Sequence, residues 1–243
     1  MSNIYDEDTF FEKYHQMSRS QLGLAGAGEW QTLRQLMPDF TDKTVLDLGC
    51  GYGWHCKYAA EHHARAVIGI DLSAKMLAKA QQLNPDEKIT YRQGDIATVA
   101  FPPATFDVVF SSLAFHYLPD WPQLVAQVKR YLKPGGTFLF SVEHPVFTAA
   151  GKQQWDYNED GSIRDFPVDN YFYEGQREAD FLGETVQKYH RSLTTYLETL
   201  LQAGFKLNHV VEPQPPQEML ELPEMADEMR RPMMLIISCQ KLG

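Results

Sequence analysis

The chain has 243 residues, of which 44% are hydrophobic, and its formal net charge at pH 7 is −10. This length and composition fit one globular domain with an insertion. The negative charge, without a cluster of lysine or arginine, disfavours a nucleic-acid partner, because such binding depends on neutralising phosphates. No apolar run is long enough to span a bilayer, and the acidic start Met1–Asp8 lacks a signal-peptide core. Three cysteines form no disulfide framework, so the composition predicts a cytoplasmic protein with no membrane partner.

In chain order, residues 1–38 precede the first strand and are expected to form a helical cap segment. Strands and helices then alternate over residues 39–144, a pattern typical of a parallel sheet wound on both faces. The predicted strands are 45–48, 66–70, 89–93, 106–111 and 138–142, and the predicted helices lie around 55–62, after Ser73 and after Asp120.

The alternation breaks over residues 145–188, where neither period is clear. This stretch is rich in aromatic residues, and its acids outnumber its bases by nine to four. We expect an insertion that caps a substrate site; the alternative is a solvated flap through which a homodimer forms. Residues 189–243 resume with a helix after Ser192 and two strands, 206–211 and 233–239, which complete the core sheet.

The most informative motif is the run Val45–Gly53, a buried strand that opens into a glycine-rich turn. A second predicted strand ends in Asp71, about 20 residues beyond the glycines, which is the layout of a nucleotide-like site in a doubly wound sheet. Glycines let the backbone approach a ligand closely. Asp71 can accept hydrogen bonds from both hydroxyls of a ribose.

Asp47 distinguishes between cofactors, because a carboxylate two residues before the first glycine would repel the pyrophosphate of a dinucleotide. The glycines Gly49, Gly51 and Gly53 also follow G-x-G-x-G spacing rather than G-x-G-x-x-G. Both features disfavour a nicotinamide oxidoreductase. They favour S-adenosylmethionine (SAM), which has a ribose and an adenine, carries an ammonium and a sulfonium, and has no phosphate.

At these residues the chain resembles the class I SAM-dependent methyltransferases, over roughly Asp39–Glu143. Two further runs match motifs of that family: Gly94-Asp95-Ile96 at the adenine motif and Leu132–Gly136 at a turn before the fifth strand. The resemblance implies that the last strand runs antiparallel beside the fifth. We therefore expect an α/β fold with a doubly wound, mostly parallel seven-stranded sheet, helices on both faces and a cap insertion.

The resemblance also implies a set of cofactor contacts, with S-adenosylhomocysteine as the product. In this family the acid at Asp47 contacts the methionine part through water, and the acid at Asp71 binds the ribose. Asp95 would accept from the adenine amino group, and a backbone N–H at Ile96 would donate to a ring nitrogen. The other expected cofactor-binding residues are Gly49, Gly51, Leu72, Met76, Ser111, Tyr14 and Arg19.

Tyr14 and Arg19 are expected to close over the cofactor from the N-terminal segment, with Arg19 on the methionine carboxylate. The alternative for Arg19 is an exposed position on a helix face. Two histidines, His116 and His144, follow the fourth and fifth strands, where open α/β sheets bind ligands. Either could act as a base near neutral pH; alternatively, His116 packs beside the cofactor and His144 anchors a loop. No metal site is expected.

The acceptor is expected to be a small molecule. Family members that methylate nucleic-acid amino groups carry a Pro-Pro-aromatic run after the fourth strand, where this chain reads Ser111-Ser-Leu-Ala. The Pro-Cys nucleophile and the paired glutamates of other classes are also absent there. The alternatives are a SAM-binding sensor or regulatory protein without turnover, and a protein or RNA methyltransferase.

Overall fold

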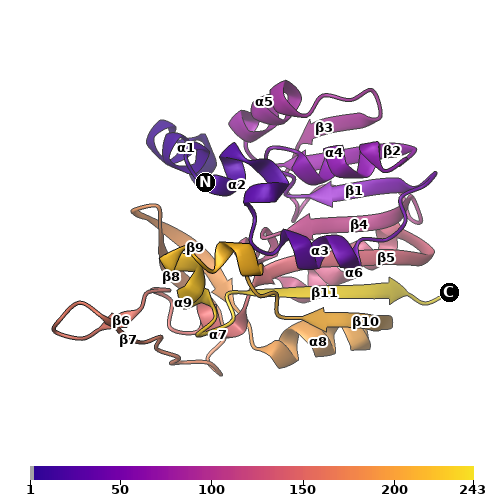
Figure 1. The fold of residues 1–243 in the computed structure, drawn as a ribbon. Helices are drawn as coiled ribbons and strands as arrows, with labels where there is room; N and C mark the ends of the chain where they lie inside the picture. The colour runs from indigo at the N-terminus through magenta and orange to yellow at the C-terminus, as the bar shows by residue number, and fades with distance from the viewer. Residues whose placement is uncertain (1–2) are drawn as a thin grey trace.

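A computed structural model describes residues 3–243, so the first two residues of the predicted N-terminal segment lie outside the described part. Seven strands form the central sheet in the order β10-β11-β5-β4-β1-β2-β3 (Figure 1). The strands of this sheet are β1 (Thr44–Leu48), β2 (Ala66–Asp71), β3 (Ile89–Gln93), β4 (Phe106–Ser112), β5 (Leu132–Glu143), β10 (Phe205–Val211) and β11 (Met234–Lys241). β11 is antiparallel to both of its neighbours, β5 and β10, which confirms the predicted fold class.

The helices are α1 (Asp8–His15), α2 (Ser18–Gln21), α3 (Trp30–Leu36), α4 (Trp54–Glu61), α5 (Ala74–Leu83), α6 (Trp121–Tyr131), α7 (Pro145–Thr148), α8 (Leu193–Gln202) and α9 (Pro223–Glu228). Four short 3-10 helices accompany them: η1 (Ile4–Asp6), η2 (Gly23–Gly26), η3 (Phe115–Tyr117) and η4 (Gln217–Met219). Within residues 3–243, none of these helices is long and apolar enough to cross a membrane.

Alternation along the strands places buried apolar side chains on both faces of the sheet. In β1, Leu46 and Leu48 point toward α6 and α8 and join the larger core, which includes Trp121 and Tyr196. Val45 points the other way, into the core made with α4 and α5. Helices therefore cover both faces, and the open end where β1, β2, β4 and β5 finish is left for a ligand.

Residues 145–188 contain two hairpins that the sequence pattern did not predict. β6 (Asp156–Tyr157) pairs with β7 (Ile163–Asp165), and β8 (Gly175–Phe181) pairs with β9 (Glu184–His190), both antiparallel. Figure 1 shows the β8–β9 hairpin at the same end of the sheet as α1 and α2. The division into four segments (1–38, 39–144, 145–188 and 189–243) stays a prediction.

The N-terminal segment contacts the tip of the β8–β9 hairpin. Lys13 Nζ donates to the carbonyl of Leu182 at 3.0 Å, and the Phe10 ring meets the Phe181 ring edge-on at 5.8 Å. The turn itself has Leu182 and Gly183 at φ of 59° and 78°. These contacts join two segments that are some of the most distant in the sequence.

One strand begins earlier than expected. β5 starts at Leu132 rather than near Phe138, and the predicted turn Leu132–Gly136 lies inside it as an irregularity. Phe106 faces Leu132 while Val108 faces Thr137, so the register shifts between these two pairs. The glycines therefore bend the strand rather than end it.

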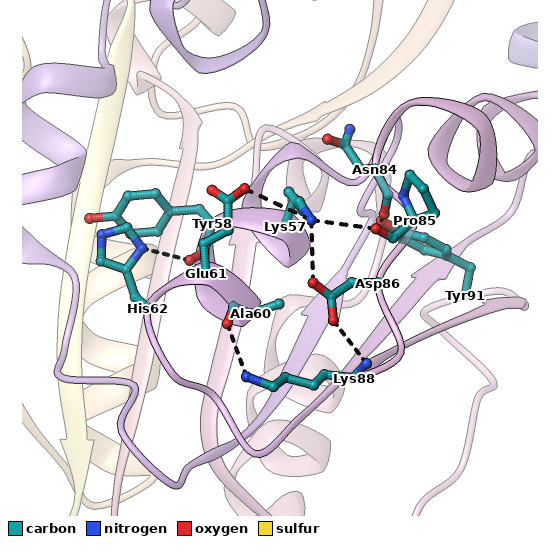
Figure 2. Close-up of polar contacts among 10 residues, drawn as sticks. All are labelled: Lys57, Tyr58, Ala60, Glu61, His62, Asn84, Pro85, Asp86, Lys88 and Tyr91. Carbon is teal, nitrogen blue, oxygen red and sulfur yellow. Dashed lines mark hydrogen bonds and ion pairs between the residues drawn. The ribbon is translucent and has the colours of Figure 1, made fainter.

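At the edge of the sheet far from the ligand end, a polar cluster ties α4 to the loop before β3 (Figure 2). Lys57 Nζ lies 3.3 Å from the Asp86 carboxylate and donates to the carbonyl of Pro85 at 3.4 Å. Lys88 Nζ donates to the carbonyl of Ala60 at 3.5 Å. This cluster is half-exposed, so each ion pair contributes little to stability.

Candidate functional site

The glycine turn after β1 is held to the end of β2 by Asp71. One carboxylate oxygen of Asp71 accepts from the N–H of Gly51 at 2.8 Å, and the other accepts from the N–H of Ser73 at 2.9 Å. Gly51 has φ of +52°, and a Cβ added there would meet nothing within 4 Å. An added Cβ at Gly49 would lie 2.4 Å from Ala114 Cβ. The turn thus presents bare backbone to open space at Gly51 and to packed protein at Gly49.

A cavity of about 500 Å³ begins at this turn and extends toward the β8–β9 hairpin. Most of the cofactor-binding residues expected from the sequence, together with His116, line it. They are Tyr14, Arg19, Gly49, Gly51, Asp71, Leu72, Met76, Asp95, Ile96 and His116. Three expected residues do not line this cavity: Asp47, Ser111 and His144.

Asp47 lies buried behind the glycine turn. Its Oδ2 accepts from the thiol of Cys56 at 3.3 Å, and its Oδ1 has no hydrogen-bond partner among the described residues. Burial raises the pKa of Asp47 to about 7. Ser111 is also turned inward, because its hydroxyl donates to the carbonyl of Leu48 at 2.6 Å, and its neighbour Ser112 lines the cavity instead.

His144 lies at the turn into the insertion. Its Nδ1 accepts from the N–H of Val146 at 3.1 Å and caps α7, and its Nε2 lies 2.9 Å from a carboxylate oxygen of Glu212. Burial lowers the pKa of His144 despite the nearby Glu212. The structure does not bring this side chain into the cavity wall.

His116 faces the cavity as a hydrogen-bond donor. Its Nδ1 lies 3.3 Å from the backbone N–H of Glu143 and must accept from it, so the proton of the neutral ring is on Nε2. Burial lowers the pKa of His116 to about 4. At neutral pH the ring is therefore uncharged, and Nε2–H can donate a hydrogen bond into the cavity.

Glu143, which ends β5, lines the cavity and was not predicted. Its two carboxylate oxygens accept from Lys188 Nζ and from Gln153 Nε2, both at 2.6 Å. Lys188 Nζ also donates to Gln153 Oε1 at 2.8 Å. Burial opposes the charge on Glu143, but His116, Lys188 and Gln153 outweigh it and lower its pKa.

Three tyrosines stand against this part of the cavity. Tyr5 meets Tyr14 and Tyr117 edge-on, with ring centres 5.4 and 6.2 Å apart. The hydroxyls of Tyr5 and Tyr117 lie 3.0 Å apart. Burial raises the pKa of all three phenols, so they are uncharged and can donate hydrogen bonds.

Arg19 is fixed by Glu29, whose two oxygens both lie 2.9 Å from one guanidinium nitrogen. Both residues border a smaller cavity of about 80 Å³ on the other side of the glycine turn. Trp54 Nε1 and Ser20 Oγ there have no hydrogen-bond partner within residues 3–243. A cation and unpaired donors thus gather where a carboxylate could bind.

These features fit SAM. The open face of Gly51 admits a close ligand, Asp71 and Asp95 border the larger cavity, and the smaller cavity suits the methionine carboxylate. The unpartnered oxygen of Asp47 suits the cationic methionine end. In the described part of the chain, no group of His, Cys, Asp and Glu side chains is arranged to hold a metal ion.

Several lining residues were not named individually in the sequence analysis, among them Tyr5, Tyr117 and Glu143. Phe181, Thr185, Val186 and Gln187 come from the insertion that was expected to cap a substrate site. Glu143 and His144 follow each other at the end of β5, so one step in the alternation decides which of them faces the cavity. We call the wall of Gly49, Gly51, Asp71, Asp95 and Ile96 the cofactor end. The acceptor end is the wall of Tyr5, His116, Tyr117, Glu143 and the β8–β9 residues Phe181 and Gln187.

Comparisons with known proteins agree with this site. Residues 46–140 match the model of a methyltransferase domain family. A solved structure from Listeria monocytogenes, described as a proposed S-adenosylmethionine dependent methyltransferase, is 53% identical, with a TM-score of 0.87 over 91% of this chain and 100% of that one. A second, from Mesorhizobium loti, is 42% identical, with a TM-score of 0.83 over 90% and 100% of the two chains.

A curated relative, the trans-aconitate 2-methyltransferase of Deinococcus radiodurans, is 36% identical over 58% of this chain and 55% of that protein. This chain therefore spans about half the length of that relative, in contrast to the two solved structures that it covers fully. Family model, fold and full-length relatives agree. The chain belongs to the class I SAM-dependent methyltransferases and uses SAM as its cofactor.

Proposed function

We propose that this enzyme methylates a neutral or amine-bearing small molecule bound at the acceptor end. The observation that carries the proposal is the single cavity of about 500 Å³ that has the glycine turn at one end and Glu143 at the other. A cavity of this size suits a cofactor with a small acceptor, rather than a protein segment or an RNA.

At the cofactor end we assign Asp71 to the ribose hydroxyls and Asp95 to the adenine amino group. Asp95 Oδ1 accepts from the N–H of Ala97 at 2.8 Å, which leaves its second oxygen for adenine. We assign Arg19 to the methionine carboxylate and Asp47 to the cationic side of the methionine part. The support is position: each of these residues borders one of the two cavities or the turn between them.

The charge of the wall argues against an anionic acceptor. Among the described lining residues of the larger cavity the cation is Arg19, and it is assigned to the methionine carboxylate of SAM. The lining carboxylates are Asp71, Asp95 and Glu143. For this reason we do not extend to this chain the polycarboxylate acceptor named for the Deinococcus relative.

Bound SAM supplies an electrophilic methyl group with a good leaving group. The task of the protein is therefore mainly to align the acceptor and exclude water. His116 Nε2–H and one phenol of the Tyr5–Tyr117 pair can donate to polar atoms of the acceptor, because the other phenol donates within the pair, and Glu143 can accept from it. The proposal requires no general base. We also expect the enzyme in the cytoplasm, because its three cysteines are free and buried.

The test is incubation of the protein with tritiated-methyl SAM and a metabolite extract, followed by separation by mass. We expect label in a low-mass product. Label only in protein or RNA would support those methyltransferase classes instead. If SAM binds by calorimetry but no fraction is labelled, the alternative of a sensor or regulatory protein is supported.

A further inference from the structure

We infer that Glu143 binds the nitrogen of an amine acceptor, and that Lys188 and Gln153, brought by the insertion, are positioning residues for it. The inference deepens the proposed function and rests on it. It names the chemical class of the acceptor and gives the insertion a specific task at the site.

The geometry around Glu143 shows a carboxylate fixed from behind. Lys188 and Gln153 each hold one oxygen at 2.6 Å and are bonded to each other at 2.8 Å, which closes a three-membered network. The Lys188 side chain is 2% exposed and that of Glu143 is 12% exposed. Each carboxylate oxygen has a second lone pair, so the side that faces the cavity can still accept a hydrogen bond.

Among the described residues of the acceptor end, Glu143 is the one carboxylate. Arg191 donates to the backbone carbonyls of Phe115 and Leu118, so its charge is engaged in holding η3. His116 presents a donor. An acceptor molecule therefore meets one anionic hydrogen-bond acceptor, Glu143, beside uncharged donors, which is the arrangement that an N–H group recognises.

Aromatic rings complete the setting. Tyr5 and Tyr117 line the cavity on one side, and Phe181 lines it on the side of the hairpin. Aromatic faces stabilise a neighbouring cationic nitrogen. Phe181 already lies 5.3 Å from Lys188 Nζ, so this ring supports the same network that fixes Glu143.

Charge movement in the reaction gives Glu143 its importance. The amine binds as the free base after losing its proton to water; its lone pair then forms the new N–C bond while the C–S bond breaks, and the electron pair of the C–S bond stays on sulfur. Positive charge thus moves from sulfur to nitrogen, and the methylated ammonium keeps its hydrogens until it leaves. A carboxylate that accepts an N–H from that nitrogen stabilises the transition state more than the neutral amine.

The experiment uses a metabolite extract separated into a cation-exchange fraction of amines, an anion-exchange fraction of acids and a neutral flow-through. Each is incubated with tritiated-methyl SAM and the full chain. We expect label mainly in the amine fraction. Glu143→Gln should lower the rate at which the amine fraction is labelled about thirtyfold, since a hydrogen bond to a charged group is lost. The affinity for SAM should stay within twofold.

Glu178→Gln is the matched control, because Glu178 is exposed on the β8–β9 hairpin and the change in charge is identical. This variant should keep the wild-type rate. Label mainly in the neutral fraction, or a wild-type rate in Glu143→Gln, would overturn the inference and leave the proposed function intact. Label mainly in the acid fraction would overturn both the inference and the proposed function. Absence of label from every fraction, with SAM bound, would overturn the proposed function and the inference together.

Two substitutions of Lys188 separate the effect of its charge from the effect of its length. Lys188→Met keeps the length of the side chain and should lower the labelling rate more than tenfold, whereas Lys188→Arg should retain at least a third of it. Gln153→Leu, which leaves Lys188 in place, serves if Lys188→Met does not fold. Equal rates in the Met and Arg variants, or a wild-type rate in Gln153→Leu, would contradict the positioning role. Lys152→Met, at an exposed neighbouring lysine, should have no effect.

Discussion

The two ends of one cavity are built in different ways. The cofactor end is made by short runs of consecutive residues at the ends of neighbouring strands, such as the glycine turn after β1 and Asp71 at the end of β2. The acceptor end combines η1, η3, the last residue of β5 and a hairpin of the insertion. The cofactor end is therefore formed by residues that are close in the sequence, and the acceptor end by residues that long-range packing brings together.

The difference between the two ends bears on how the acceptor can change while the cofactor stays the same. The sheet fixes the cofactor end whatever the loops contain, so the donor site can stay the same while acceptors change. At the acceptor end, Glu143 comes from the sheet but its partners Lys188 and Gln153 come from the insertion. Changes in the insertion should therefore alter the acceptor without altering SAM binding.

The largest expected effect tests the cofactor end at Asp71. Asp71→Asn should weaken SAM binding about a hundredfold, because charge-assisted hydrogen bonds to the ribose are lost. The same change weakens the bonds to Gly51 and Ser73, so the melting temperature should fall as well. Calorimetry checks the affinity, with Asp86→Asn as a control far from the cavity. An Asp71→Asn protein with wild-type SAM affinity would remove Asp71 from the site.

A pH experiment tests how the ionisation of Asp47 affects the stability of the free protein and its affinity for SAM. Its pKa is raised by burial to about 7, above the unfolded value of about 3.9, so ionising Asp47 destabilises the free protein. Stability should therefore fall as the pH rises from about 4 to about 7, by at most ~1.4 kcal/mol per pH unit. SAM binding should weaken below pH 7, by up to about tenfold per unit.

Urea unfolding and calorimetry between pH 5 and 8 measure both trends. Asp47→Asn should flatten both, because the amide does not titrate. If wild type and Asp47→Asn show the same pH dependence, another group is responsible.

Arg19 is probed with two ligands. Arg19→Met should weaken SAM binding about tenfold through loss of a charged hydrogen bond to the carboxylate. Decarboxylated SAM lacks that group and should lose little affinity. Because Arg19→Met leaves the buried Glu29 unpaired with either ligand, comparing the two affinity losses removes that shared cost. Arg34→Met, at an exposed position of α3, is the control; equal losses for both ligands would place the carboxylate elsewhere.

A smaller effect is expected at Asp95, which is exposed. Inosine lacks the amino group that Asp95 is proposed to bind. Asp95→Ala should therefore narrow the affinity gap between S-adenosylhomocysteine and its inosyl analogue by a few fold. Competition binding with both compounds measures the gap, and an unchanged gap would assign adenine recognition to other residues.

The smallest effect concerns the cluster in Figure 2, which belongs to neither end of the cavity. Lys57→Met removes contacts to Asp86 and Pro85 and should lower stability by no more than ~1 kcal/mol, as for other half-exposed pairs. SAM affinity should not change. A large loss of SAM affinity would show that the framework of the sheet and the cofactor end are coupled.

The antiparallel last strand and most of the cofactor-end residues were expected from the family resemblance. Sequence patterns predicted the parallel strands and the glycine turn, because each depends on neighbours in the chain. They failed to predict the β8–β9 hairpin for a physical reason. Its buried positions alternate at Val186, Lys188 and His190, and two of these three are polar, so the usual apolar alternation is missing. The turn Leu182-Gly183 also lacks the Asn or Asp that commonly marks such a hairpin.

The sequence also did not determine which side chain faces the cavity at the end of a strand. Ser111 and Ser112 differ by one step, as do Glu143 and His144, and one step reverses the face to which a side chain points. In each pair the sequence analysis named one residue, and its neighbour lines the cavity. The hydrogen bonds that settle the matter, from Ser111 to Leu48 and from Glu143 N–H to His116, join residues 27 or more positions apart.

The N-terminal segment, residues 3–21, forms part of the wall of both ends, through Tyr5 and Arg19. Asp6 Oδ1 accepts from the Ser73 hydroxyl at 2.6 Å, the Tyr5 and Tyr117 hydroxyls lie 3.0 Å apart, and Lys13 bonds to the hairpin tip, so side-chain contacts rather than strand pairing hold the segment in place. Such contacts open at lower cost than a packed core. Spent cofactor and methylated product would then leave through one gate, and the opening of that gate would set the upper limit on turnover.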